Sequence, residues 1–134
     1  MNIRLDHKTT VKDIQDIFCL TYPFLQIRFS AKPHHRLVAG QDIDWFASHM
    51  HLVALTKKKI ADSITLRPWY QTGDVEQEFE AKLGLHAEIF RKEGEQWIKT
   101  NGTDSFTLFE QNEIGMRNNE EQHINRWIER EKLL

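Results

Sequence analysis

The stretch that decides the fold is TGDVEQEFEAKLGLHAEIFR, residues 72–91, because an earlier stretch of the chain follows the same plan. Residues 10–29 read TVKDIQDIFCLTYPFLQIRF. Each stretch opens on a threonine and continues as a short amphipathic segment that contains Phe18 or Phe79. Each then turns at a proline or glycine and leaves as an alternating run that begins with leucine. We interpret the two stretches as one structural unit that occurs twice.

The first stretch predicts a helix followed by a strand. Thr10 is a favourable N-cap, and Asp13 three residues later can complete a capping box close to the positive end of the helix. Pro23 then ends the helix, because proline cannot continue it. Apolar residues recur at helical spacing and then at every second position: Val11, Ile14, Phe18 and Tyr22 in the helix, and Leu25, Ile27 and Phe29 in the strand.

The second stretch repeats this pattern. Thr72 or Asp74 is the expected N-cap. Gly84 is suited to the left-handed conformation that closes a helix. The apolar residues again change from helical spacing to alternation: Val75, Phe79 and Leu83 in the helix, and Leu85, Ala87 and Ile89 in the strand.

A short alternating run precedes each helix, at residues 1–7 and 62–68. The unit is therefore predicted to be β-α-β. Two such units in one small domain can place both helices on one face of an antiparallel sheet. The expected fold is α+β, with duplicated β-α-β units that form a ferredoxin-like sheet, plus a C-terminal helical extension.

A chain of 134 residues is expected to form one domain. The segment RKEGEQW predicts a hairpin between the last two strands, and the capping box TLFE starts the C-terminal helical region. The sequence leaves open whether Gly115 splits that region into two helices. The predicted parts are residues 1–30 for the first unit, 31–61 for a connecting segment, 62–99 for the second unit with its hairpin, and 103–134 for the helical region.

The composition is that of a globular protein, with 40% hydrophobic and 28% charged residues. No apolar run approaches the roughly 18 residues that a bilayer crossing needs, and the polar start MNIRLDHKTT has no signal-peptide pattern. Cys19 is the single cysteine and excludes an internal disulfide. These features predict a cytoplasmic protein. Cys19 lies beside Phe18 and Leu20 without a basic neighbour, so we interpret it as a small buried apolar residue and not as a nucleophile.

A histidine-rich segment spans residues 32–51. If HMH is part of a strand, His49 and His51 lie on one side of it, a spacing that can bind a transition metal when a third ligand converges. The candidate third ligands are His34, His35 and the carboxylates of Asp42 and Asp44. Arg36 is the best donor for a phosphate or carboxylate. No spaced second ligand pair accompanies them. The interpretation favours solvated loop histidines, and no metal or cofactor is predicted.

The segment RPWYQ, residues 67–71, is the most suggestive surface feature. Arg67, Trp69 and Tyr70 are of the residue types enriched at binding hot spots. They lie between a predicted strand and a predicted helix cap, where a loop would expose them. The alternative, that Trp69 folds back over the edge of the core, is slightly favoured.

The C-terminal region carries an apolar stripe on an otherwise charged helix, formed by Ile124, Trp127, Ile128 and Leu134. An amphipathic helix covers such a stripe on its own domain or in a partner. The two alternatives have equal weight, and a two-fold homodimer is the most economical form of the second.

No catalytic or nucleotide-binding pattern is present. The pI of about 6.4 and the lack of an RNA-recognition signature make nucleic acid an unexpected partner, although Phe90 and Arg28 could lie on an open sheet face. The sequence favours a non-catalytic binding or adaptor domain that acts through protein–protein contacts or self-association. The alternative is a small-ligand or metal-dependent enzyme or sensor that uses the histidine-rich segment.

Overall fold

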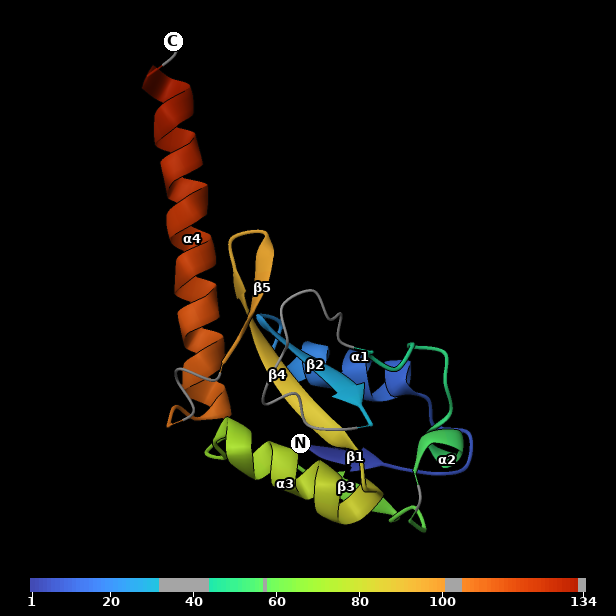
Figure 1. The fold of residues 1–134 in the computed structure, drawn as a ribbon. Coiled ribbons are helices and arrows are strands. Elements are labelled where there is room, and N and C mark those ends of the chain that lie inside the picture. Colours follow the sequence, from blue (N-terminus) through green and yellow to red (C-terminus); the bar gives the residue numbers. More distant parts are fainter. Residues whose placement is uncertain (32–43, 57, 101–104, 133–134) are drawn as a thin grey trace.

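A computed structural model of the chain describes residues 1–31, 44–56, 58–100 and 105–132. Figure 1 shows the order of its helices and strands along the sequence. The elements are β1 (Asn2–Arg4), α1 (Val11–Thr21), β2 (Leu25–Ser30), α2 (Leu52–Leu55), β3 (Ser63–Thr65), α3 (Thr72–Leu83), β4 (His86–Glu93), β5 (Gln96–Lys99) and α4 (Leu108–Lys132).

The described strands form two antiparallel sheets. In the first, β1 pairs with β3, and Ile3 is opposite Ile64. In the second, β4 lies between β2 and β5, and Arg28 is opposite Glu88. The chain is therefore an α+β protein, as predicted. The single ferredoxin-like sheet is not confirmed, because each strand of the first unit pairs with its counterpart in the second unit, and the two pairs belong to separate sheets.

The start of α1 is confirmed in detail. Thr10 Oγ1 accepts a hydrogen bond from the Asp13 amide at 3.2 Å, and Asp13 Oδ2 accepts one from the Thr10 amide at 2.9 Å. This capping box satisfies two amide groups that would otherwise lack partners at the helix end. α1 packs against β2 and buries Val11, Ile14 and Phe18.

The start of α3 differs from the prediction. Its N-cap is Gln71, and neither Thr72 nor Asp74 occupies that position. The reason is that the Asp74 carboxylate accepts the Gln71 amide at 2.9 Å, which makes Asp74 the third helical residue. The end of α3 is as predicted, because Gly84 closes the helix in the left-handed region with φ of 65°.

The core is built around three phenylalanines. Phe18 and Phe79 are both fully buried, and the Phe79 ring meets the Phe29 ring edge-on at 5.0 Å between centroids. The expected burial of Cys19 is wrong, since Cys19 is exposed and Leu20 beside it is 82% exposed. The two residues that follow Phe18 turn away from the core, because each step along a helix rotates the side chain by about 100°.

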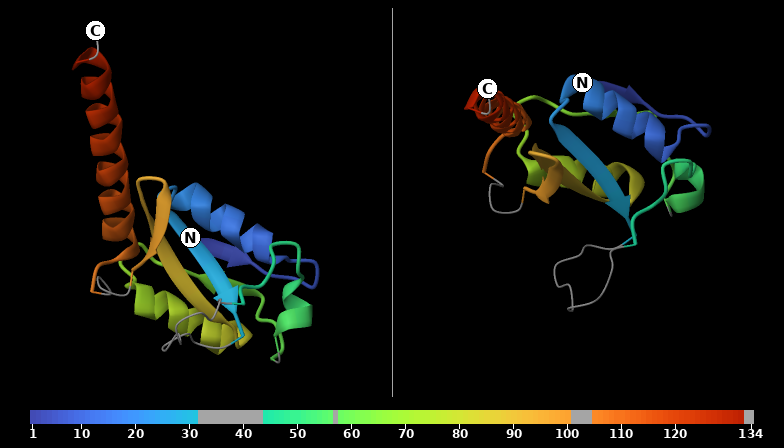
Figure 2. Two further views of the ribbon diagram at one scale, coloured as in Figure 1. Left: turned by 45° about the horizontal axis from the view of Figure 1, so that its top comes forward. Right: turned by 90° about the horizontal axis from the view of Figure 1, so that it is seen from above.

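α4 is one continuous helix of 25 residues, and Gly115 does not divide it. At 1.5 Å per residue it is about 37 Å long. Its first half packs against β4 and β2. Its second half continues beyond the rest of the described structure, past the turn of the β4–β5 hairpin (Figures 1 and 2). The predicted hairpin is confirmed, and Gly94 in its turn has a φ of 66°.

Gly115 lets α4 approach the second sheet closely. A Cβ atom added at Gly115 would lie 2.8 Å from the Cβ of Phe24. One turn earlier in the helix, Asn112 Oδ1 accepts a hydrogen bond from the Phe24 amide at 2.9 Å. The first half of α4 is therefore fixed to the residue that precedes β2.

Candidate protein-binding surface

α4 has an inner face that packs on the sheet and an outer face that does not. Leu108, Gln111 and Gly115 are buried on the inner face. The nine steps from Gly115 to Ile124 make two and a half turns, so Ile124 points to the opposite side of the helix. We define the outer face by the residues that recur at three- and four-residue steps on that side: Phe109, Glu113, Arg117, Glu120, Ile124, Trp127 and Ile128.

The free end of the outer face carries a tip cluster of three exposed apolar side chains, Ile124, Trp127 and Ile128. Trp127 is 60% exposed. On the inner side of the same turns, Arg126 Nη2 lies 3.0 Å from Glu95 Oε1 in the turn of the β4–β5 hairpin. The helix is thus held on the side away from the tip cluster. Leu134, the fourth residue of the predicted stripe, lies outside the described residues.

The start of the outer face carries a base cluster of two exposed aromatic residues, Phe106 and Phe109. They line a cavity of about 290 Å³ together with Ile114 and the charged side chains that follow on α4. This cluster is not among the residues predicted from the sequence. The sequence does contain a signal for it. The residue before an N-cap often packs on an apolar side chain at the fourth helical position. Here Phe106 precedes the N-cap, and the fourth helical residue is the polar Gln111.

The segment with Trp69 adjoins the base cluster. Trp69 is 66% exposed, so the expectation that it folds over the core edge is wrong. It lies in the turn before α3, where Tyr70 takes the position that packs on the core. The Arg67 guanidinium lies 5.9 Å from the centroid of the Trp69 ring. The amides of Leu108 and Phe109 donate to carbonyl groups of this segment at 2.8 and 3.2 Å, which places Trp69 beside the start of α4.

The three-stranded sheet has a polar cluster on the face opposite the core. The Glu88 side chain is only 10% exposed, and its two oxygens lie 3.1 Å from His86 Nε2 and 3.2 Å from Lys99 Nζ. Arg28 is the cross-strand neighbour of Glu88. Burial lowers the pKa of Arg28, and the charge of Glu88 opposes that shift. Because the carboxylate contacts groups on β4 and β5 and faces β2, the polar cluster joins all three strands.

The aromatic part of this face is covered. Phe90 is only 4% exposed. The Arg28 guanidinium lies 4.1 Å from its ring centroid, and the Trp45 ring meets it edge-on at 5.7 Å. Phe90 is therefore not available as an open stacking platform for a base, which is how sheet-face aromatic residues recognise RNA.

The histidines do not come together as a strand would place them. His49 lies in a turn, and His51 is the N-cap residue of α2. The expected strand is absent because His51 forms an isolated bridge with the N-cap of α1, after which the chain enters α2. His34, His35, Arg36 and Asp42 lie outside the described residues. Within the described ranges, no three His, Cys, Asp or Glu residues are grouped to hold a metal ion.

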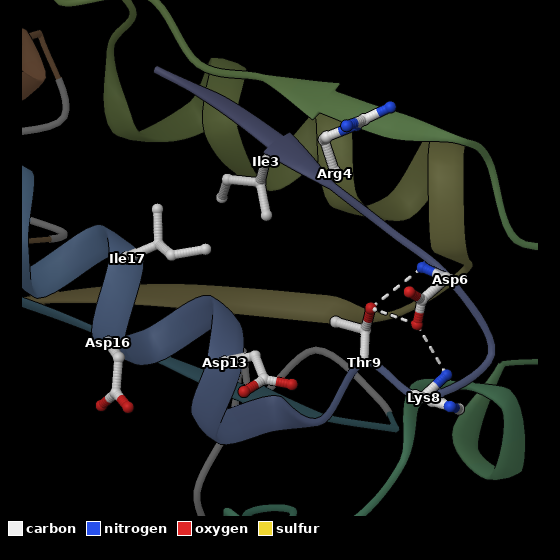
Figure 3. Close-up of a pocket in the computed structure, with 8 residues that line it drawn as sticks. All are labelled: Ile3, Arg4, Asp6, Lys8, Thr9, Asp13, Asp16 and Ile17. Carbon is white, nitrogen blue, oxygen red and sulfur yellow. Dashed lines mark hydrogen bonds between the residues drawn. The ribbon is translucent and has the colours of Figure 1, made fainter.

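A shallow cavity of about 380 Å³ between β1 and α1 is lined by three aspartates that lie apart from one another (Figure 3). Asp6 accepts the Lys8 amide at 2.7 Å, and this hydrogen bond is the main reason that the pKa of Asp6 is lowered. Asp13 belongs to the capping box of α1, and Asp16 forms an ion pair with Lys12. Each carboxylate therefore stabilises the local structure of its own segment.

No protein-family model, curated protein or solved structure matches this chain. None of the helices in the described ranges has both the length and the apolar character that crossing a membrane requires. The outer face of α4, with its two apolar clusters, is the feature from which a function can be argued.

Proposed function

We propose that this chain is a non-catalytic binding domain that acts through protein–protein contacts, and that its partner is a second copy of itself. One observation carries the proposal. The second half of α4 extends beyond the rest of the described structure (Figure 1). Its apolar side chains are exposed, and helix geometry places them on the side opposite the buried Gly115.

A projecting helix of this kind needs a partner for two reasons. Most helices in proteins are stabilised mainly by tertiary packing of an apolar face, and isolated helices shorter than about 12–15 residues are marginal in water. In addition, Trp127 and two isoleucines expose apolar surface whose burial is favourable at about 25 cal/mol per Å². Tryptophan is also among the residues that most often dominate binding energy.

The charges on the projecting half favour a second copy over a strongly charged partner. Residues 117–132 contain four basic residues and four acidic residues, so their net charge is 4 − 4 = 0. Two such helices do not repel each other through net charge. The same balance gives no attraction to the phosphates of nucleic acid or to an anionic membrane surface.

The test is truncation after Asn119, followed by sedimentation and thermal unfolding. The full chain is expected to sediment as a dimer. The truncated chain is expected to be a monomer. Its melting temperature should be nearly the same as that of the full chain when both are measured at concentrations where the full chain is monomeric. A monomeric full chain, or a truncated chain that unfolds, would contradict the proposal.

A point variant sharpens this test. Trp127→Ala should weaken dimerisation by about 2 kcal/mol or more, as removal of a central aromatic side chain does in other interfaces. Leu20→Ala is the matched control, because Leu20 is an exposed apolar residue on α1 and does not belong to the outer face of α4. That control should leave the dimerisation constant unchanged.

We also propose that the two β-α-β units are repeats of one ancestral unit. When they are aligned on Phe18 and Phe79, Ile3 corresponds to Ile64. The turn after the helix has one extra residue in the first unit, and once this residue is allowed for, Arg28 corresponds to Glu88. Each of these corresponding pairs is directly opposite in a strand pair. Approximate two-fold symmetry between repeats requires such pairing. Similar losses of stability on Phe18→Ala and Phe79→Ala would support the repeat, and clearly unequal losses would contradict it.

The alternative function, a small-ligand or metal-dependent enzyme or sensor that uses residues 32–51, stays a prediction. Its described histidines, His49 and His51, do not share one side of a strand. No geometry among the described residues favours it over the binding domain.

A further inference from the structure

We infer that two copies pair antiparallel along the outer faces of α4, so that the tip cluster of each copy packs against the base cluster of the other. This inference rests on the proposed self-association and adds the orientation and register of the two helices. It is carried by the distribution of apolar surface, cavity and charge along the outer face.

The outer face is apolar at both ends and charged in the middle. Phe106 and Phe109 lie at the start, and the tip cluster lies at the end. Between them, Glu113, Arg117 and Glu120 recur at four- and three-residue steps, the spacing that keeps one seam of a helix against a partner helix. A second helix that covers this whole seam must present apolar groups at both ends.

The cavity at the base fits an aromatic side chain. Its volume is about 290 Å³, which is below the range of about 300–1,000 Å³ for pockets that hold small-molecule ligands. Phe106, Phe109 and Ile114 supply its apolar lining. In an antiparallel pair, Trp127 is the largest apolar side chain that reaches this position, and a buried aromatic ring in contact with other rings is favourable.

The surface area that a specific dimer interface must bury also requires the base cluster. Specific interfaces bury about 1,200–2,000 Å² in total, or at least about 600 Å² from each copy. A fully buried aromatic side chain contributes about 150–250 Å², and the tip cluster has one aromatic residue and two partly covered isoleucines. Contact between two tips alone is therefore too small. The two phenylalanines of the base cluster and the charged side chains between the clusters extend the contact over the whole outer face, which gives a larger buried area.

The charges select the antiparallel orientation. In a parallel pair each residue faces its own copy, so Glu113, Arg117 and Glu120 would each meet a like charge. An antiparallel pair can place Arg117 opposite Glu120 of the other copy, and by symmetry it makes this contact twice. In that register Glu113 is opposite Ile124, and Phe109 is opposite Ile128.

Site-specific cross-linking of the full chain tests the register. Cys19 is exposed, so the background is Cys19→Ser. Glu113→Cys and Ile124→Cys are made as separate proteins and treated with a short bis-maleimide, alone and mixed. The mixture should give cross-linked dimer, and neither protein alone should do so. Dimer from either single variant would indicate a parallel or tip-to-tip pair and would overturn the inference, as would a dimeric protein with no cross-link in the mixture.

Charge reversal gives an independent readout. Arg117→Glu places like charges opposite each other twice and should weaken dimerisation about tenfold. The double variant Arg117→Glu/Glu120→Arg should restore dimerisation, because it exchanges the two charges of each contact. Equal affinity of the wild type and the single variant would overturn the inference. Circular dichroism of each variant shows whether α4 stays helical.

The two proposals fail in different ways. A wild-type chain that is monomeric in sedimentation contradicts the self-association itself. A dimeric wild-type chain with the wrong cross-links, or without rescue by the double variant, contradicts only the antiparallel register.

Discussion

Phe18 and Phe79 show what single residues determine in this chain. Each is fully buried and lies on the helix of one β-α-β unit. Each was identified from helical spacing alone, because a buried stripe repeats every three or four residues. Cys19 was misjudged because its character was taken from its neighbours in sequence, whereas exposure on a helix depends on rotation around the axis.

Phe18→Ala and Phe79→Ala should each lower the free energy of unfolding by about 3–5 kcal/mol, because each leaves a cavity in a close-packed core. Urea denaturation measures this quantity. Leu20→Ala on the exposed side of α1 is the control and should change stability by less than about 0.5 kcal/mol. A loss below 1 kcal/mol at one phenylalanine and a full loss at the other would contradict equivalent sites in two repeats.

Among the elements, the starts of α1 and α4 and the end of α3 were predictable, whereas the start of α3 and the sheet partners were not. The capping boxes that start α1 and α4 involve residues three positions apart, so the sequence contains all the necessary information. The pairing of β1 with β3 and of β2 with β4 joins residues about sixty positions apart. Nothing in the alternating pattern of a strand specifies its neighbour, and for that reason two separate sheets could not be predicted.

The close packing of α4 against Phe24 can be tested with a substitution at Gly115. Gly115→Ala should lower stability by about 1–3 kcal/mol, because the new methyl group would meet Phe24 at 2.8 Å and overpacking has that cost. Gly73→Ala in α3 is the matched control, since nothing lies within 4 Å of its added Cβ. The control should raise stability by about 0.5–1 kcal/mol through better helix propensity. Thermal unfolding of both variants distinguishes these outcomes, and a stabilised Gly115→Ala would show that α4 does not pack closely at this point.

For the whole molecule, the predicted α+β class is confirmed, whereas the single ferredoxin-like sheet is not, and the sequence predicted one of the two apolar clusters on α4. The tip cluster could be found because three apolar residues stand out in a charged tail. The base cluster could not be joined to it, because only the continuity of α4 through Gly115 places Phe109 and Trp127 on one face. The exposure of Trp69 also depends on a turn whose direction the sequence does not specify.

The strand pairing has a consequence for the order of folding. In the part of the chain that the structure describes, both strands of the first half, β1 and β2, pair with strands of the second half. Contacts between residues far apart in sequence slow folding, because loop-closure entropy is lost before the contacts form. A nascent chain therefore cannot pair β1 until β3 has been synthesised, and it cannot pair β2 until β4 has been synthesised. A fragment of residues 1–61 should show no cooperative unfolding in urea, and mixing it with residues 62–134 should restore a transition. A cooperative transition in the first fragment alone would show that the half-chain is an autonomous folding unit.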